Sequence, residues 1–74
     1  MITIYGKEDC PYCEAAQMLM ESRGLEFEYK DMKSNPDVFD EVTKRLGGIP
    51  PRLAPQIFDG EVYVGGFDKA RDYF

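Results

Sequence analysis

The chain contains no histidine and no tryptophan, and only two of its 74 residues are cysteines. A structural zinc site needs four ligands, so one within this chain is improbable. Secreted mini-domains held together by disulfides usually carry four or more cysteines spread along the chain, which is not the pattern here. No apolar run approaches the roughly 20 residues of a membrane span, and the N-terminus lacks the basic start and long apolar stretch of a secretory signal. We therefore expect a cytoplasmic protein.

Basic residues are outnumbered by acidic ones. Nine lysines and arginines stand against 14 aspartates and glutamates, which gives a formal net charge of −5. Binding to nucleic acid needs a basic surface that displaces counterions, and an anionic membrane needs one as well. Neither is expected as a partner. The length fits a single domain, residues 1–74, with one small core.

Alternating apolar residues and turn signals predict the order of the elements. Strands are expected at 2–5, 25–29, 56–58 and 61–64, and the last two form a hairpin around Asp59-Gly60. Helices are expected at 11–23, from 36 to about 46, and at about 67–73. The first strand, helix and second strand form a βαβ unit, so we expect a parallel pair with a right-handed crossover.

Helix start and stop signals support the two longer helices. Pro11 suits the first turn of the first helix, and Gly24 suits the position after its end. Asn35 is expected to cap the second helix ahead of Pro36, and Gly47-Gly48 to end it. Its inner face is predicted to consist of Phe39, Val42 and Leu46.

The two cysteines lie three positions apart in Cys10-Pro11-Tyr12-Cys13, at the start of the first helix. Free backbone N–H groups and the positive helix end favour a thiolate there, so the pKa of Cys10 should lie below the usual ~8.5. Cys13 falls on the stripe that continues through Ala16 and Met20, and it should be buried. An exposed attacking thiol beside a shielded resolving thiol is the arrangement that dithiol–disulfide exchange requires.

Three motifs in order resemble the dithiol glutaredoxins over nearly the whole chain. They are Cys10-Pro11-Tyr12-Cys13, Ala54-Pro55-Gln56-Ile57-Phe58 and Gly65-Gly66. The resemblance implies an α/β fold of the thioredoxin-like (glutaredoxin) type, with three helices and a four-stranded mixed sheet in the order 2-1-3-4. It also implies that Cys10 and Cys13 are the catalytic pair, with no metal and no permanently bound cofactor.

The same resemblance implies a binding site for glutathione as cosubstrate. Pro55 would be a cis-proline facing the dithiol, and the backbone of Ala54 would pair with an extended cysteinyl peptide. Asp68 would either pair with the ammonium of glutathione or cap the last helix. The full set of expected binding residues is Lys7, Tyr12, Ala54, Pro55, Gly66, Phe67 and Asp68.

Some positions depart from the family pattern. Leu53 and Ala54 replace the usual threonine and valine, Lys69 stands where an acidic residue is common, and the loop at 47–52 looks about two residues longer. These changes do not affect the dithiol chemistry. The family's detailed contacts with glutathione, however, do not transfer to this chain at the changed positions. Arg45 and Arg52 remain alternatives for a second carboxylate contact.

The predicted function is therefore glutathione-dependent reduction of protein disulfides and glutathione mixed disulfides by a monomer. Ribonucleotide reductase is a candidate protein substrate on the resemblance alone. The alternative within redox chemistry is a redoxin recharged by a thioredoxin reductase. An alternative of another class is a non-enzymatic binding module or a carrier of a glutathione-ligated iron–sulfur cluster.

Overall fold

The computed structural model describes residues 1–74, which form four strands and three helices in the predicted order. The strands are β1 (Ile2–Gly6), β2 (Phe27–Asp31), β3 (Gln56–Asp59) and β4 (Val62–Gly65). The helices are α1 (Pro11–Ser22), α2 (Pro36–Arg45) and α3 (Phe67–Tyr73). None of these helices has the length and apolar composition that crossing a membrane requires.

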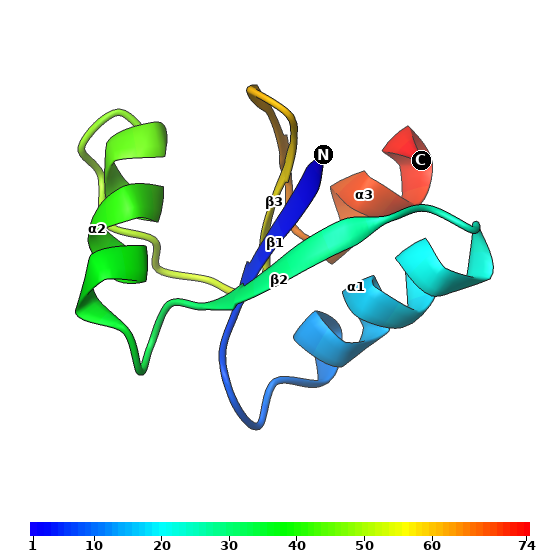
Figure 1. The fold of residues 1–74 in the computed structure, drawn as a ribbon, viewed down its shortest axis with the longest axis horizontal. Coiled ribbons are helices and arrows are strands. Elements are labelled where there is room, and N and C mark those ends of the chain that lie inside the picture. The colour runs from blue at the N-terminus through cyan, green and yellow to red at the C-terminus, as the bar shows by residue number, and fades with distance from the viewer.

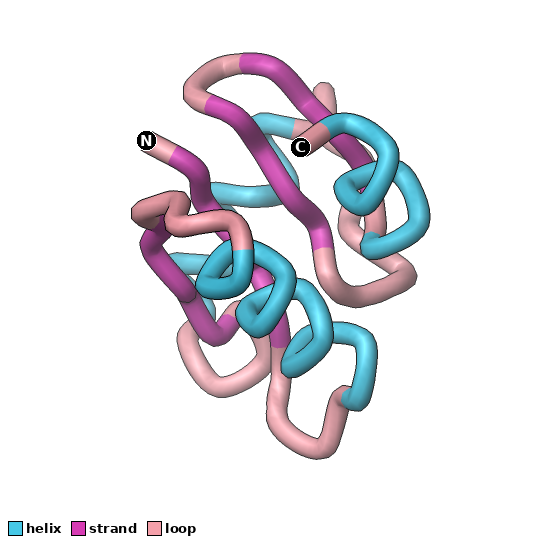
Figure 2. Tube along the Cα trace, turned by 90° about the vertical axis from the view of Figure 1, so that its right-hand side faces the viewer, coloured by secondary structure: helices cyan, strands magenta, loops and turns pink.

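The strands form one mixed sheet in the order β2-β1-β3-β4. The β1–β2 pair is parallel, and the β1–β3 and β3–β4 pairs are antiparallel. The predicted strand order is therefore confirmed. Helices α1 and α3 cover one face of the sheet, and α2 covers the other (Figures 1 and 2).

Two separate apolar clusters fill the two faces. The α1/α3 core consists of Ile2, Ile4, Ala16, Met20, Ile57 and Ala70. The α2 core consists of Tyr5, Met32, Val42 and Phe58. Successive side chains of a strand point to opposite faces, so neighbouring residues such as Ile4 and Tyr5 belong to different cores.

Helix α1 ends at Ser22, one residue earlier than predicted. A glycine in the left-handed conformation follows its C-cap residue. Gly24 has a φ of +66°, which favours glycine because it lacks a Cβ. Its N–H donates to the carbonyl of Glu21 at 3.1 Å, and the N–H of Leu25 donates to that of Met20 at 2.9 Å. This pair of bonds is the Schellman motif, and it keeps Leu25 in the helix cap.

The second strand consequently starts later than the sequence pattern indicates. We expected a strand at 25–29, but β2 runs from Phe27 to Asp31. Its register follows β1, with Ile2 opposite Phe27 and Gly6 opposite Asp31. Because the helix cap includes Leu25, β2 starts two residues later than predicted. Pairing with β1 extends the strand to Asp31, two residues beyond its predicted end.

Two expectations about α2 are wrong in detail. Asn35 occupies the N-cap position, but its side-chain Nδ2 donates to the carbonyl of Asp31 at 3.1 Å instead of capping the helix. Phe39 points outward and is 36% exposed. The inner face consists of Val38, Val42 and Leu46, a ridge with four-residue spacing.

The hairpin loop is shifted by one residue from the prediction. Asp59 remains in β3, where it pairs with Ile2 of β1 and with Val62 of β4. The two-residue turn is therefore Gly60–Glu61, and β4 extends to Gly65. Pairing with β1 on the far side of β3 holds Asp59 in the sheet, and a local turn signal cannot show that.

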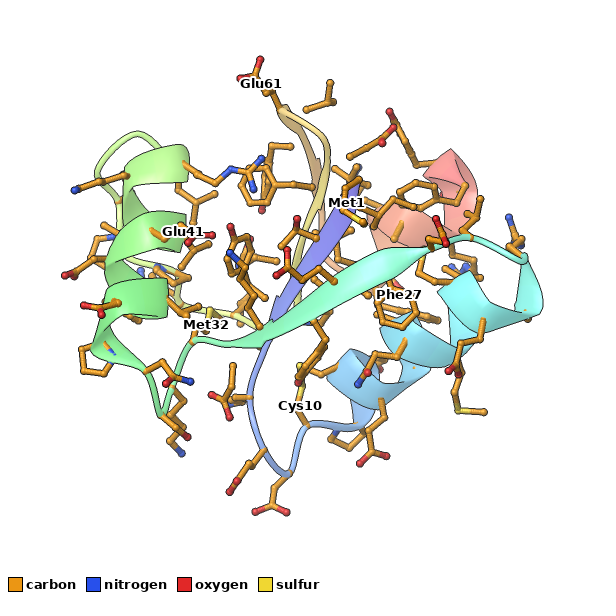
Figure 3. All side chains as sticks on the ribbon, in the orientation of Figure 1. Met1, Cys10, Phe27, Met32, Glu41 and Glu61 are labelled. Carbon is orange, nitrogen blue, oxygen red and sulfur yellow. A yellow bond between two sulfur atoms is a disulfide. The ribbon has the colours of Figure 1, made fainter.

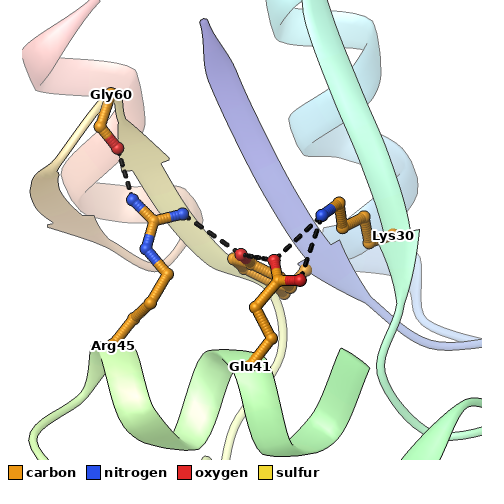
Figure 4. A network of polar contacts seen from close by, with 5 residues as sticks. Lys30, Glu41, Arg45 and Gly60 are labelled. Carbon is orange, nitrogen blue, oxygen red and sulfur yellow. Dashed lines mark hydrogen bonds and ion pairs between the residues drawn. The ribbon is translucent and has the colours of Figure 1, made fainter. Parts of the chain in front are cut away.

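A polar network ties α2 to the sheet (Figure 4). The hydroxyl of the buried Tyr5 donates to Glu41, and Lys30 donates to the same carboxylate at 2.9 Å. Arg45 donates to the Tyr5 oxygen at 3.1 Å and to the carbonyl of Gly60. The four side chains join α2 to β1, β2 and the hairpin turn.

The network also perturbs the protonation of its members. Burial raises the pKa of Tyr5, and the hydrogen bond to Glu41 raises it further. Hydrogen bonds from Tyr5 and from Lys30 lower the pKa of Glu41. The guanidinium carbon of Arg45 lies 3.9 Å from the centroid of the Phe58 ring, a cation–π contact that adds to the attachment of α2.

Candidate active site

The two cysteines lie where the loop after β1 meets α1 (Figure 3). Cys10 is the N-cap residue, with extended backbone, and its sulfur accepts the N–H of Cys13 at 3.2 Å. The two residues form a disulfide, with their Cα atoms 5.2 Å apart, inside the usual range. The sulfur of Cys10 thus sits where unpaired helix N–H groups converge.

Burial of the pair agrees only in part with expectation. Cys13 is 1% exposed and belongs to the predicted buried stripe of α1 with Ala16 and Met20. Cys10, expected to be exposed, is only 6% exposed in this oxidised state. The disulfide turns its sulfur toward Cys13, and the carbonyl oxygen of Ala54 lies 3.9 Å from it.

The segment before β3 lies against the disulfide. The Ala54–Pro55 peptide bond is cis, as predicted, and Pro55 is buried. Ala54 is half-buried, and its carbonyl oxygen is the backbone group near Cys10. A cysteinyl chain bonded to Cys10 would therefore meet the backbone of Ala54 first.

A groove of about 460 Å³, which we call the main groove, opens at Tyr12, between the two cysteines in sequence, and at Ala54, whose carbonyl lies near Cys10. It is lined by Tyr12, Leu53, Ala54, Pro55, Gln56, Tyr63, Gly66, Phe67, Asp68 and Lys69. Of the seven predicted binding residues, the structure brings together all except Lys7. Lys7 lies on the exposed loop before Cys10, and its side chain makes no hydrogen bond or ion pair. The groove is large enough for a small peptide ligand.

The main groove is lined by both aromatic and charged side chains. The rings of Tyr12 and Phe67 approach to 5.9 Å between centroids and link the starts of α1 and α3. Asp68 is exposed, and its only ion pair is a long one of 3.9 Å to Arg71. The carboxylate of Asp68 therefore remains available to a ligand.

Sequence reasoning missed four lining residues: Leu53, Gln56, Tyr63 and Lys69. The buried Gln56 donates from Nε2 to the carbonyl of Leu53 at 2.7 Å and accepts the Tyr63 hydroxyl at 2.6 Å. Gln56 lies inside the motif from Ala54 to Phe58 that carries the family resemblance, and its place there is a sequence signal for a role in the site. Tyr63 reaches the groove through the register of the hairpin, which is shifted by one residue from the one that the Asp59-Gly60 signal predicts.

The side chain of Lys69 reaches the main groove by passing over Gly65. A Cβ placed on Gly65 would lie 3.0 Å from Cγ of Lys69, closer than ordinary van der Waals contact. The first glycine of the double-glycine motif therefore leaves room for the lysine stem. The ammonium of Lys69 makes no hydrogen bond or ion pair with the rest of the chain.

A second hollow of about 260 Å³, which we call the side pocket, adjoins the main groove. It is lined by Leu46, Ile49, Pro50, Pro51, Arg52, Leu53, Gln56 and Tyr63. The location separates the two arginines that the sequence left as alternatives. Arg52 lines the side pocket, whereas Arg45 is engaged with Tyr5 and Gly60 on the α2 face. No three histidine, cysteine, aspartate or glutamate side chains gather as metal ligands.

Comparison with known proteins adds three similarities. The family model described as Glutaredoxin matches residues 2–64. Glutaredoxin 3 of Escherichia coli K12 is 37% identical over 67 residues, which cover 90% of this chain and 77% of that protein. Glutaredoxin-like protein NrdH of Salmonella typhimurium LT2 is 39% identical over 66 residues, covering 89% of this chain and 76% of that protein.

A solved structure extends the comparison to three dimensions. The NrdH-redoxin of Escherichia coli, described as having a thioredoxin-like activity profile, superposes with a TM-score of 0.72 at 32% sequence identity. The match covers 92% of this chain and 84% of that protein. The thioredoxin-like arrangement of the sheet and helices is thereby confirmed.

Proposed function

Because this chain belongs to the glutaredoxin family, we propose that it reduces protein disulfides and glutathione mixed disulfides with glutathione as cosubstrate. The family and the cysteine pair establish the coarser activity, that of a thiol–disulfide oxidoreductase. One observation carries the finer proposal. The Cys10 sulfur lies at the N-terminus of α1, beside Cys13 and the backbone of Ala54, where a peptide-sized groove begins.

The reductive half of the cycle starts from the dithiol. The Cys10 thiolate attacks one sulfur of a substrate disulfide, the substrate S–S bond breaks, and the departing thiolate takes up a proton. Cys13 then loses its proton and attacks the Cys10 sulfur, which releases the second substrate thiol. Two electrons have passed to the substrate, and the protein is left with the Cys10–Cys13 bridge.

Glutathione restores the dithiol in two exchanges. The first glutathione thiolate attacks Cys10, forms a mixed disulfide there and releases Cys13 as a thiol. The second attacks the sulfur of the bound glutathione, releases oxidised glutathione and regenerates the Cys10 thiolate. The N–H of Cys13, which reaches the Cys10 sulfur in the bridge, is placed to stabilise that thiolate.

The main groove offers partners for each part of glutathione. The N–H and C=O of Ala54 would pair with the cysteinyl residue as a short added strand. Asp68 offers a carboxylate for the ammonium of glutathione. Tyr12 and Phe67 would border the γ-glutamyl arm. Lys7 would have to reach the ligand from its loop outside the groove.

A second candidate reductant is a thioredoxin reductase. Identity to an NrdH protein is as high as identity to Glutaredoxin 3, and an NrdH-redoxin is described as having a thioredoxin-like activity profile. The chemistry at Cys10 and Cys13 is the same in both cases, so the reductant depends on the groove. Lys69 in place of an acidic residue is the feature that favours this second candidate.

The test is to compare the two recharging systems on one substrate, hydroxyethyl disulfide. We expect turnover with glutathione, glutathione reductase and NADPH, and little with thioredoxin reductase and NADPH. Asp68→Ala should raise the KM for glutathione about twofold to fivefold, as expected for an exposed ion pair, and leave kcat nearly unchanged. Turnover with thioredoxin reductase alone would support the second candidate instead.

The cellular setting is proposed on the family resemblance. We place the protein in the cytoplasm, where reduced glutathione is available, as a single-domain monomer. Ribonucleotide reductase is the candidate protein substrate. A non-enzymatic role with a glutathione-ligated iron–sulfur cluster would show as colour in the purified protein, and we expect a colourless preparation.

A further inference from the structure

We propose that the side pocket and the main groove form one trough for an extended segment of a protein substrate. The side pocket would receive an apolar side chain close to the substrate cysteine, and Arg52 would pair with a carboxylate just beyond it. This inference rests on the proposed function and specifies the class of protein substrate. That class is a disulfide flanked by an apolar residue and then an acidic residue.

The two hollows adjoin one another. They share Leu53, Gln56 and Tyr63, which form a ridge between them. Gln56 is buried, and both ends of its side-chain amide are hydrogen-bonded within this ridge, to Leu53 and to Tyr63. Gln56 is therefore a positioning residue that shapes the trough. An extended chain that pairs with the backbone at Ala54 can pass from one hollow to the other.

The main groove already has the volume for a ligand of the size of glutathione. The additional 260 Å³ of the side pocket is left over for a longer chain. A protein substrate provides residues on both sides of its cysteine, and alternate side chains of an extended segment enter successive pockets. The side pocket thus distinguishes a protein substrate from glutathione.

Exposed apolar side chains line the entrance of the side pocket. Ile49 is 66% exposed and Leu53 is 77% exposed, and neither belongs to a core cluster. Contact with an apolar substrate side chain would remove their surface from water, which favours binding. Pro50 and Pro51 restrict the backbone between them, so less conformational entropy is lost when the loop is bound.

The charge of the trough is opposite to that of the protein as a whole. Arg52 is exposed and makes no hydrogen bond or ion pair, in contrast to Arg45, which makes two hydrogen bonds and stacks on Phe58. Lys69 is equally unpaired in the main groove. With Arg52 and Lys69 against one carboxylate, that of Asp68, the trough carries a local positive charge in a protein of net charge −5. Such a surface complements an acidic substrate segment.

The experiment measures attack by Cys10 on two peptides and on glutathione, each carrying the same coloured leaving group, nitrothiobenzoate. One peptide has leucine at the second position and glutamate at the fourth position on both sides of its cysteine, so that both side chains lie on the same side of the extended chain as the cysteine. The other has serine and lysine at these positions. The Cys10 thiolate attacks the peptide or glutathione sulfur, the S–S bond breaks, and nitrothiobenzoate leaves as a coloured thiolate. In a Cys13→Ser background the reaction stops at the mixed disulfide, so stopped-flow absorbance gives one rate constant.

The readout is each peptide rate divided by the glutathione rate, which cancels changes in the reactivity of Cys10. We expect the leucine–glutamate peptide to react at least about threefold faster than the serine–lysine peptide. Arg52→Glu should lower that preference about threefold to tenfold, because it replaces an attraction with a repulsion. Ile49→Ser should lower the same preference about threefold. Lys33→Glu, an equal charge reversal outside both hollows, should leave it unchanged.

Two results would overturn the inference. If Arg52→Glu and Lys33→Glu give the same preference for the leucine–glutamate peptide, the side pocket does not contribute to substrate recognition. If Arg52→Glu slows the glutathione and peptide reactions equally, Arg52 belongs to the glutathione site. The proposed function is tested separately by turnover with glutathione reductase. A peptide preference without that turnover would refute the glutathione dependence and leave the trough intact.

Discussion

On one face of the sheet, α1 and α3 pack through six buried apolar residues, and the cysteine pair lies at the start of α1. On the other face, α2 packs through a smaller cluster and is joined to the sheet by the Tyr5, Glu41, Lys30 and Arg45 network. The first face depends on apolar burial, and the second depends in addition on charged hydrogen bonds at the edge of the protein.

The difference separates two tasks. Cys13 and Met20 lie on the same buried stripe, so the geometry of the dithiol is tied to the packing of the α1/α3 core. Helix α2 itself contributes no residue to the main groove, and on its face only Ala54, which packs against the α2 core, approaches Cys10 through its backbone carbonyl. The contribution of the α2 face is to hold the end of α2, from which the side-pocket loop continues. We therefore expect changes on the α1/α3 face to affect chemistry or stability strongly, and changes on the α2 face to affect stability mildly.

The largest expected effect comes from the cysteines. Cys10→Ser should reduce all thiol-transfer activity to background, because it removes the nucleophile. Cys13→Ser should retain reduction of glutathione mixed disulfides and lose reduction of protein disulfides, because only the latter need a resolving thiol. Both are measured by coupled NADPH oxidation with each substrate class. Activity in Cys10→Ser together with none in Cys13→Ser would reverse the assignment.

The two cores should differ when each loses one buried side chain. Met20→Ala, at a fully buried position of the α1/α3 core, should lower the free energy of unfolding by about 2–5 kcal/mol. Val42→Ala, at a fully buried position of the α2 core, removes fewer atoms and should cost roughly 1–2 kcal/mol. Urea unfolding of both variants checks the order. An equal or larger loss in Val42→Ala would show that α2 is as essential to the fold as α1.

The polar network should contribute less than either core. Tyr5→Phe removes the hydroxyl between Glu41 and Arg45 and should lower the free energy of unfolding by about 1–2 kcal/mol, without changing turnover. Tyr73→Phe is a matched control, because its exposed hydroxyl also donates to a carboxylate, that of Asp59. The control should lie within about 0.5 kcal/mol of the wild type. A loss of stability in Tyr5→Phe no larger than that in the control would show that the network does not stabilise the attachment of α2 to the sheet.

The smallest effect is a pH dependence. Hydrogen bonds from Tyr5 and from Lys30 lower the pKa of Glu41 below its usual 4.5. Its stabilisation is therefore present above the unfolded pKa and is lost as the pH falls through the lower native value. Glu41→Gln should lose less stability than the wild type between pH 7 and pH 3.5, by urea unfolding. Some loss should remain, because backbone N–H groups also lower the pKa of Asp31. Identical losses in both proteins would exclude Glu41 as a source of acid sensitivity.

Much of the fold follows from local signals. Pro11 and Gly24 bracket α1, the stripe of Cys13, Ala16 and Met20 marks its buried face, and the α3 range was predicted without error. The order of strands and the approach of Pro55 to the dithiol came from a family resemblance. The errors lie where a distant partner decides the outcome, as in the two-residue shift of β2.

The sequence by itself determined the dithiol at a helix start, the acidic balance of the chain and the succession of strands and helices. The acidic balance follows from composition alone, and the other two properties depend on residues close to each other along the chain. Only the tertiary structure decided that Tyr63 and Lys69 share a groove with Tyr12, that Lys7 lies outside it, and that Arg45 is engaged elsewhere while Arg52 is free. The register of the hairpin and the packing of α2 and α3 set these relations, and both depend on contacts between residues far apart in the sequence.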